Sequence, residues 1–248
     1  MRRGHLHVGP GSRARVTLAL AALVIVGLAT APTVEAAPGY QMDLGRRSDF
    51  VAQTNLVQCV GASAQMMLNM MSGSADRTAW TQATLQRVAR SWSGPRPDGR
   101  VRRGASVFGW AAALTMFGGG RYEVVGGSTI DEALLIAAKA MRRTGRPVGL
   151  LMWRGRHAWV MSGFRATRDP LLPGARVTSV IVEDPLYPRD SRTWGASPAP
   201  GSRLTVAQLG RQFVRRRTSN QWIQSIQLSG KYVVVIPFQD PRRHRLEF

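Results

Sequence analysis

Four residues have the types and spacing used in acyl-transfer chemistry: Gln53, Cys59, His157 and Asp184. A thiol attacks as its thiolate, and the start of a helix or a neighbouring imidazolium favours that charged form. Cys59 and His157 supply a nucleophile and its base, and Asp184 fits the acceptor that must orient the other imidazole N–H. The tetrahedral intermediate also needs donors directed at its oxyanion, which the side-chain amide of Gln53 and the backbone N–H of Cys59 fit.

Each of these residues also has an ordinary structural interpretation. A buried cysteine commonly packs as a small hydrophobe, a lone histidine is more often hydrogen-bonded than catalytic, and a carboxylate before Pro185 is usually a turn residue. His157 stands out by elimination, because His5 and His7 lie in a predicted export signal and His244 lies in a basic tail. The combination of residues, rather than any one of them, favours a reactive site.

The elements that must position these residues follow the order of an α+β domain. Residues 59–71 are apolar nearly all round a helical circumference and predict a buried central helix that begins at Cys59. Asp76 and Thr78 are alternative caps for the next helix. Further helices are expected at 76–92, 107–116, 129–143 and 205–215, and strands at 147–153, 157–164, 177–185 and 231–238, after an irregular segment at 37–52. Helices first and strands later predict an α+β fold.

Three motifs resemble the papain-like cysteine peptidase superfamily, including its bacterial branches of bacteriocin-leader peptidases and papain-like effector proteases. They are "QTNLVQC" at 53–59, "GRHAWVMSGF" at 155–164 and "VIVEDP" at 180–185. The resemblance implies a papain-like fold, in which the nucleophile helix of an N-terminal helical part packs on a C-terminal antiparallel sheet. It also implies roles for four residues: nucleophile Cys59, general base and acid His157, orienting group Asp184 and oxyanion donor Gln53.

The sequence departs from that pattern in two places. Val60 stands where these families usually have glycine or tryptophan, and it alters the wall beside the nucleophile. A long loop, "ATRDPLLPGAR", separates the histidine strand from the aspartate strand, so Asp190 is a second candidate for the orienting group. Gln58 likewise competes with Gln53 as an oxyanion donor.

The first 36 residues predict a secretory signal. A positively charged start is followed by the uncharged run 16–31, and Val34 and Ala36 have the small side chains that a cleavage site requires. An uncleaved anchor is the alternative, because the run is only slightly shorter than a membrane span. We expect a peptidase domain at 37–240 and a basic tail at 241–248. Cys59 can form no disulfide within the chain, which draws attention to it in an exported protein.

The formal net charge of +20 comes almost wholly from arginine, since Lys139 and Lys231 are the only lysines. Scattered arginines usually form a solvated face, although a cationic exported domain is attracted to anionic cell-envelope surfaces. No nucleic-acid motif is present, so nucleic acid is not an expected partner. One cysteine and one histidine in the body argue against zinc, and no glycine cluster precedes a Lys-Ser or Lys-Thr pair of a phosphate loop. No cofactor is expected.

These observations predict an exported cysteine hydrolase that cleaves peptide or isopeptide bonds through an acyl-enzyme. The alternative is a catalytically inactive papain-like binding module at the cell envelope. A cell-wall peptidase of the Cys-His-His kind is disfavoured, because such enzymes share an Asp-Cys-Ser-Gly helix start where this sequence has Gln-Cys-Val-Gly.

Overall fold

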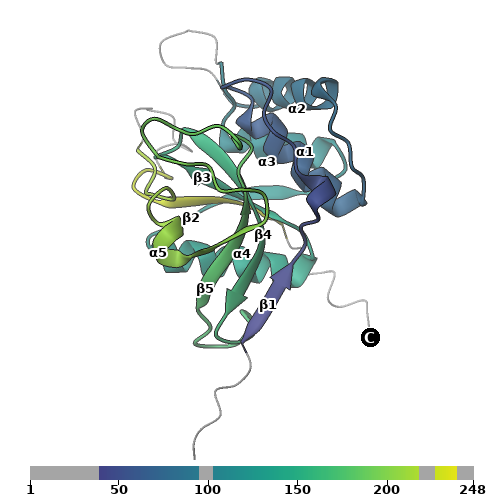
Figure 1. The fold of residues 1–248 in the computed structure, drawn as a ribbon. Coiled ribbons are helices and arrows are strands. Elements are labelled where there is room, and N and C mark those ends of the chain that lie inside the picture. The colour runs from purple at the N-terminus through teal and green to yellow at the C-terminus, as the bar shows by residue number, and fades with distance from the viewer. Residues whose placement is uncertain (1–38, 95–102, 218–226, 239–248) are drawn as a thin grey trace, which may run out of the picture. The chain divides into compact units, whose positions relative to one another are not determined.

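The strands form one antiparallel sheet in a computed structural model that describes residues 39–94, 103–217 and 227–238. Within these residues the sheet has seven strands, in the order β2-β7-β3-β4-β5-β6, and β1 pairs with the second half of β4 (Figure 1). The strands are β1 (Tyr40–Asp43), β2 (Tyr122–Gly127), β3 (Val148–Met152), β4 (His157–Ala166), β5 (Val177–Glu183), β6 (Ser202–Thr205) and β7 (Tyr232–Pro237).

Helices cover both faces of this sheet (Figure 1). One face carries α1 (Cys59–Ser72), α2 (Ala79–Ser91) and α3 (Val107–Met116), and the other carries α4 (Ile130–Thr144). Two short elements, η1 (Arg47–Asp49) and α5 (Val206–Leu209), lie in connections. The α+β class expected from the sequence is therefore confirmed, with the helix that begins at Cys59 packed on an antiparallel sheet.

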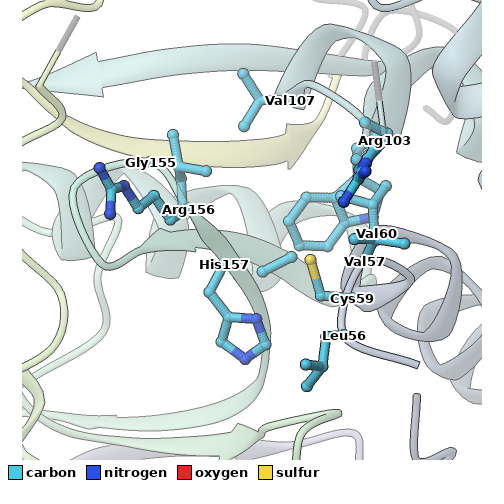
Figure 2. Close-up of a pocket in the computed structure, with 14 residues that line it drawn as sticks. Leu56, Val57, Cys59, Val60, Arg103, Val107, Gly155, Arg156 and His157 are labelled. Atoms are coloured by element: carbon cyan, nitrogen blue, oxygen red, sulfur yellow. The ribbon is translucent and has the colours of Figure 1, made fainter. Parts of the chain in front are cut away.

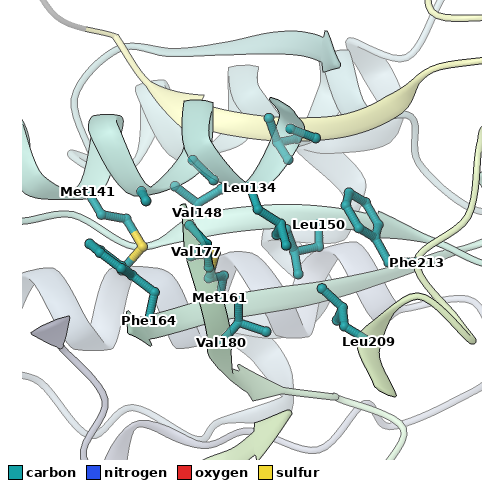
Figure 3. Close-up of a cluster of buried hydrophobic side chains, with 14 of the residues drawn as sticks. Leu134, Met141, Val148, Leu150, Met161, Phe164, Val177, Val180, Leu209 and Phe213 are labelled. Atoms are coloured by element: carbon teal, nitrogen blue, oxygen red, sulfur yellow. The ribbon is translucent and has the colours of Figure 1, made fainter. Parts of the chain in front are cut away.

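The side chains of β4 divide between two hydrophobic cores. Ala158 and Val160 pack with α1, α2 and α3, whereas Trp159 and Met161 pack with α4. Figure 3 shows Met161 in the second cluster, among side chains from α4, β3 and β5. This alternation follows from the period of two in a strand, and covering both faces explains why the strand is apolar along most of its length.

Several predicted elements are confirmed closely. The helix at 59–71 is α1, and the strands at 147–153, 157–164 and 177–185 correspond to β3, β4 and β5. Of the two candidate caps for α2, the structure uses Thr78, whose side chain accepts a hydrogen bond from the Thr81 N–H. These local signals were sufficient because each lies within a single turn or strand.

Two predictions were wrong. The segment 37–52 is not wholly irregular, because Tyr40 and Met42 in β1 pack against the sheet core while the alternate residues face outward. The expected helix at 205–215 stops after Leu209, and the chain continues in turns. It does so because the backbone oxygen of Gln212 accepts a hydrogen bond from the Trp153 N–H, which places this segment by a tertiary contact.

The predicted signal at 1–36 and the basic tail at 241–248 lie outside the described residues. Among the helices in the described ranges, none is both long enough and apolar enough to cross a membrane.

Close approach of α2 to the start of α1 depends on Gly61. A Cβ atom at this position would lie 2.6 Å from the backbone oxygen of Gln82 and 2.9 Å from the Cβ of Gln86. We expect Gly61→Ala to lower the free energy of unfolding by about 1–3 kcal/mol, because α2 must move away. Urea denaturation followed by circular dichroism measures the loss. Gly104→Ala is the control, since a Cβ there meets nothing within 4 Å; equal stability of the two variants would contradict the prediction.

Candidate active site

A buried hydrogen bond joins His157 to Asp184. His157 is the first residue of β4 and Asp184 follows β5, so the pairing of these neighbouring strands brings the two side chains together. Nε2 of His157 lies 2.7 Å from Oδ1 of Asp184, and the side chains are 4% and 0% exposed. The same oxygen accepts a hydrogen bond from the Leu186 N–H at 2.8 Å. The carboxylate is thus fixed by the backbone while it orients the ring.

Cys59 lies beside this pair as the first residue of α1. Cys59 and His157 line the same pocket (Figure 2), and the thiol interacts with the imidazole. Because Nε2 is engaged by Asp184, Nδ1 is the ring nitrogen left for exchange of a proton with sulfur. The structure therefore brings together three of the four residues expected from the sequence.

The environment of His157 favours its protonated form. Burial alone would lower its pKa, but the hydrogen bond with Asp184 and the interactions with Cys59 outweigh burial and raise the pKa from 6.5 to about 9. At neutral pH the ring is consequently an imidazolium, which can donate a proton to a leaving group.

Two buried glutamines of α2 hold the loop that leads to Cys59. The Gln82 side chain accepts from the Thr54 N–H at 2.8 Å and donates to the Ala52 oxygen at 3.0 Å. The Gln86 side chain accepts from the Gly61 N–H at 2.9 Å and donates to the Val57 oxygen at 3.0 Å. Neither glutamine was predicted to support the site, although two amides four residues apart on the apolar face of α2 are a detectable signal.

The fourth predicted residue, Gln53, is buried but does not line the pocket. Its amide nitrogen donates to the Asn55 oxygen at 2.8 Å, and its backbone N–H donates to the Pro185 oxygen at 2.7 Å. Gln53 thus links the loop before Cys59 to the segment that follows Asp184. One amide N–H is engaged in this way, which leaves the second for another acceptor.

The two competing residues have other partners. The side-chain oxygen of Gln58 accepts a hydrogen bond from the Thr54 hydroxyl, outside the His157–Asp184 pair. Asp190 accepts a hydrogen bond from the Ser197 N–H at 3.2 Å, in the loop after β5, whereas Asp184 is the carboxylate bonded to His157.

Trp153 stacks on the His157 ring and was not predicted to belong to the site. The ring centroids lie 3.9 Å apart at an interplanar angle of 19°. The indole N–H donates to the Gln212 side chain at 2.7 Å, and Trp194 also stacks with Trp153, with centroids 6.3 Å apart. Trp153 has a left-handed φ of 57° in the tight turn between β3 and β4. The indole is therefore held in place by three partners.

A cavity of about 620 Å³ opens at Cys59 and His157. Its wall combines apolar side chains from α1, α3, β3 and β4 with Arg103 and Arg156, and Figure 2 shows the two arginines together with Cys59 and His157. A cavity of this size accommodates a peptide side chain next to the thiol. Within the described ranges, no group of three or more histidine, cysteine or acidic side chains is arranged to hold a metal ion.

Comparisons with known proteins include a likeness to a solved structure. No protein-family model and no curated protein matches the chain. A solved structure from Bacillus anthracis, provisionally named a C39-like peptidase, is similar at 11% identity and a TM-score of 0.42, over 77% of this chain and 94% of that chain.

Removal of the Trp153 indole should slow alkylation of Cys59. We expect Trp153→Leu to lower the rate with iodoacetamide about threefold to tenfold near neutral pH, because the imidazolium loses a stacked aromatic face. Alkylation rates measured across a pH series separate an altered His157 ionisation from a general loss of folding. Trp80→Leu is the matched control, since Trp80 is 75% exposed on α2. Equal rates in the two variants would contradict the role assigned to Trp153.

Protonation of His157 should make stability depend on pH. Its pKa is raised from 6.5 to about 9, so its contribution is complete below about pH 6.5 and is lost as the pH rises through about 9. In a Cys59→Ser background, which removes the thiol from the proton balance, we expect the free energy of unfolding to fall by up to roughly 2 kcal/mol between pH 7 and 9.5, and by less when His157→Gln is added, because the glutamine loses no proton.

Urea denaturation at several pH values measures this difference. Measurements start at pH 7 because burial raises the pKa of Glu183 from 4.5 to about 7. Ionisation of that group lowers the free energy of unfolding as the pH rises from about 4.5 to about 7, which would obscure the effect of His157. Parallel curves above pH 7 for Cys59→Ser with and without His157→Gln would refute the prediction.

Proposed function

We propose that this protein is a cysteine hydrolase that cleaves peptide or isopeptide bonds with Cys59 as the nucleophile. The observation that carries the proposal is the buried His157–Asp184 hydrogen bond of 2.7 Å, with the His157 ring beside the thiol at the mouth of a cavity. A structural histidine could satisfy its hydrogen bond at many buried sites. His157 lies beside the single cysteine of the sequence, and that cysteine begins a helix. A thiol nucleophile requires such a neighbouring base.

In the first half of the reaction the Cys59 thiolate attacks the substrate carbonyl carbon. A carbon–sulfur bond forms, and the carbonyl π electrons move to oxygen. The N–H of Cys59 lacks an intrahelical acceptor because it begins α1, so it can donate to this oxyanion. The Gln53 amide is the proposed second donor. His157 then gives the proton on Nδ1 to the leaving nitrogen as the carbon–nitrogen bond breaks.

In the second half, water replaces the leaving amine. Neutral His157 takes a proton from the water as its oxygen attacks the thioester carbon, and collapse of the intermediate releases the acid and Cys59. Asp184 keeps its bond to Nε2 throughout, which holds Nδ1 toward the reacting atoms and stabilises the imidazolium.

The proposal also includes export to the cell exterior or the outer face of a bacterial envelope, after removal of residues 1–36 or with them as an anchor. The charged start and the uncharged run of the sequence support this placement. The proposed partners are a peptide or protein substrate and an anionic envelope surface, which the net charge of +20 would attract.

Alkylation of Cys59 by iodoacetamide, measured against pH, tests the proposed site. The native protein should react rapidly well below the pH at which a free thiol ionises, because the imidazolium stabilises the thiolate. We expect His157→Ala to lose at least about tenfold of the rate near pH 6, and Asp184→Asn to lose less, since its ring is misoriented but present.

Asp190→Asn is the matched control, because this carboxylate is bonded to Ser197 rather than to His157. Slow labelling that increases only near the pH of ordinary thiol ionisation, and that is unchanged in His157→Ala, would reject the hydrolase. That outcome would favour a papain-like binding module.

A further inference from the structure

The cavity beside Cys59 carries positive charge on its wall. Arg103 and Arg156 line it, and none of the lining residues in the described ranges is an aspartate or glutamate. Within these ranges neither guanidinium has a hydrogen bond or ion pair, in contrast to the arginine–aspartate pairs elsewhere on the protein. Two uncompensated cations at the mouth of a cavity favour an anionic ligand.

The two arginines are not equivalent. In Figure 2 the Arg103 side chain extends toward Cys59 and Val60, whereas the Arg156 side chain extends away from Cys59. Arg103 precedes α3, and Arg156 belongs to the turn before β4. A carboxylate bound near the thiol would therefore pair with Arg103, while Arg156 would contribute only to the surrounding field.

A fully buried indole forms part of the wall of the cavity. Trp110 is fully buried, and no acceptor within the described ranges bonds its indole N–H. Its six-membered ring lies over Gly149 of β3, where an added Cβ would be 2.5 Å from the ring, so the indole cannot easily turn. Because the indole N–H has almost no accessible surface, Trp110 contributes a rigid wall to the cavity rather than a donor to a ligand.

The wall also includes apolar side chains. Val60, Val107 and Leu151 line the cavity and are buried or half-buried. They offer contact to methylene groups and no hydrogen bonds to a polar stem. The cavity thus combines apolar contact with positive charge.

We propose that this cavity binds a substrate residue with an aliphatic stem and a carboxylate end, as in glutamate, and that Arg103 determines this specificity. The inference rests on the proposed function, because the bound residue would flank the bond that Cys59 attacks. The substrate class is accordingly an acidic peptide, recognised by charge at Arg103.

Four alkylating reagents test the preference: the iodoacetyl derivatives of glutamate amide, glutamine amide, leucine amide and lysine amide. In each reaction sulfur bonds to the methylene carbon and iodide leaves with the electron pair of the carbon–iodine bond. Each rate is divided by that of iodoacetamide with the same protein. We expect the glutamate reagent to react about tenfold faster than the lysine reagent at low salt, with a smaller ratio at high salt.

Two variants locate the preference. Arg103→Gln should bring the glutamate and glutamine reagents to nearly the same rate. Arg156→Gln should keep at least half of the native ratio of the glutamate rate to the glutamine rate. A lysine reagent that reacts as fast as the glutamate reagent would overturn the proposal. Equal losses in the two arginine variants would overturn the assignment to Arg103.

An inactive Cys59 and a cavity without preference for glutamate give different results in these measurements. Slow reaction with iodoacetamide itself would contradict an activated Cys59, but the ratios among the four reagents would still report the cavity. If Cys59 reacts with none of them, the indole ¹⁵N–H resonance of Trp110, assigned with Trp110→Phe, is titrated with acetyl-glutamate amide and acetyl-lysine amide. A shift with the glutamate compound alone supports the proposal, and no shift with either compound overturns it.

Discussion

The hydrogen bond between His157 and Asp184 is the interaction on which the site depends. Both groups are removed from water, so neither can be charged without the other nearby, and each offsets the burial cost of its partner. The bond places a requirement on the fold, because the first residue of β4 must lie next to the end of β5. The pairing of Val160 with Glu183 satisfies this requirement. A shift of one residue in that register would turn one of the two side chains to the opposite face.

The second requirement is that a helix on one face of the sheet places its thiol beside the first residue of β4. Cys59 begins α1 on the face where Ala158 and Val160 pack, while the neighbouring residues of β4 serve the core under α4. Two glutamines of α2, Gln82 and Gln86, fix the loop before the helix by bonds to its backbone. Because both layers are rigidly packed, the thiol and the imidazole are positioned before any substrate binds.

Helices and strands with local signals were predicted from the sequence, whereas contacts defined by distant partners were not. The helix at Cys59 and the strand at His157 are each visible in a short apolar pattern. β2 was missed because its apolar run is only Val124 and Val125 before two glycines, whereas its partner β7 has a longer apolar run and was predicted. Trp153 was missed as a site residue because its stacking on His157 depends on a left-handed turn and on Gln212. A pattern of residue types contains no record of such contacts.

The adjacent carboxylates of Glu183 and Asp184 show how the fold selects one of two candidates. Successive residues of a strand project to opposite sides, so only Asp184 reaches His157. Glu183 instead accepts from the Ser162 hydroxyl and the Gly201 N–H, at 3.2 and 3.0 Å. Burial with these neutral donors raises the pKa of Glu183 to about 7, because they offset only part of the cost of removing a carboxylate from water. Since only Asp184 faces a group that can become a cation, strand alternation decides which acid can orient the imidazole.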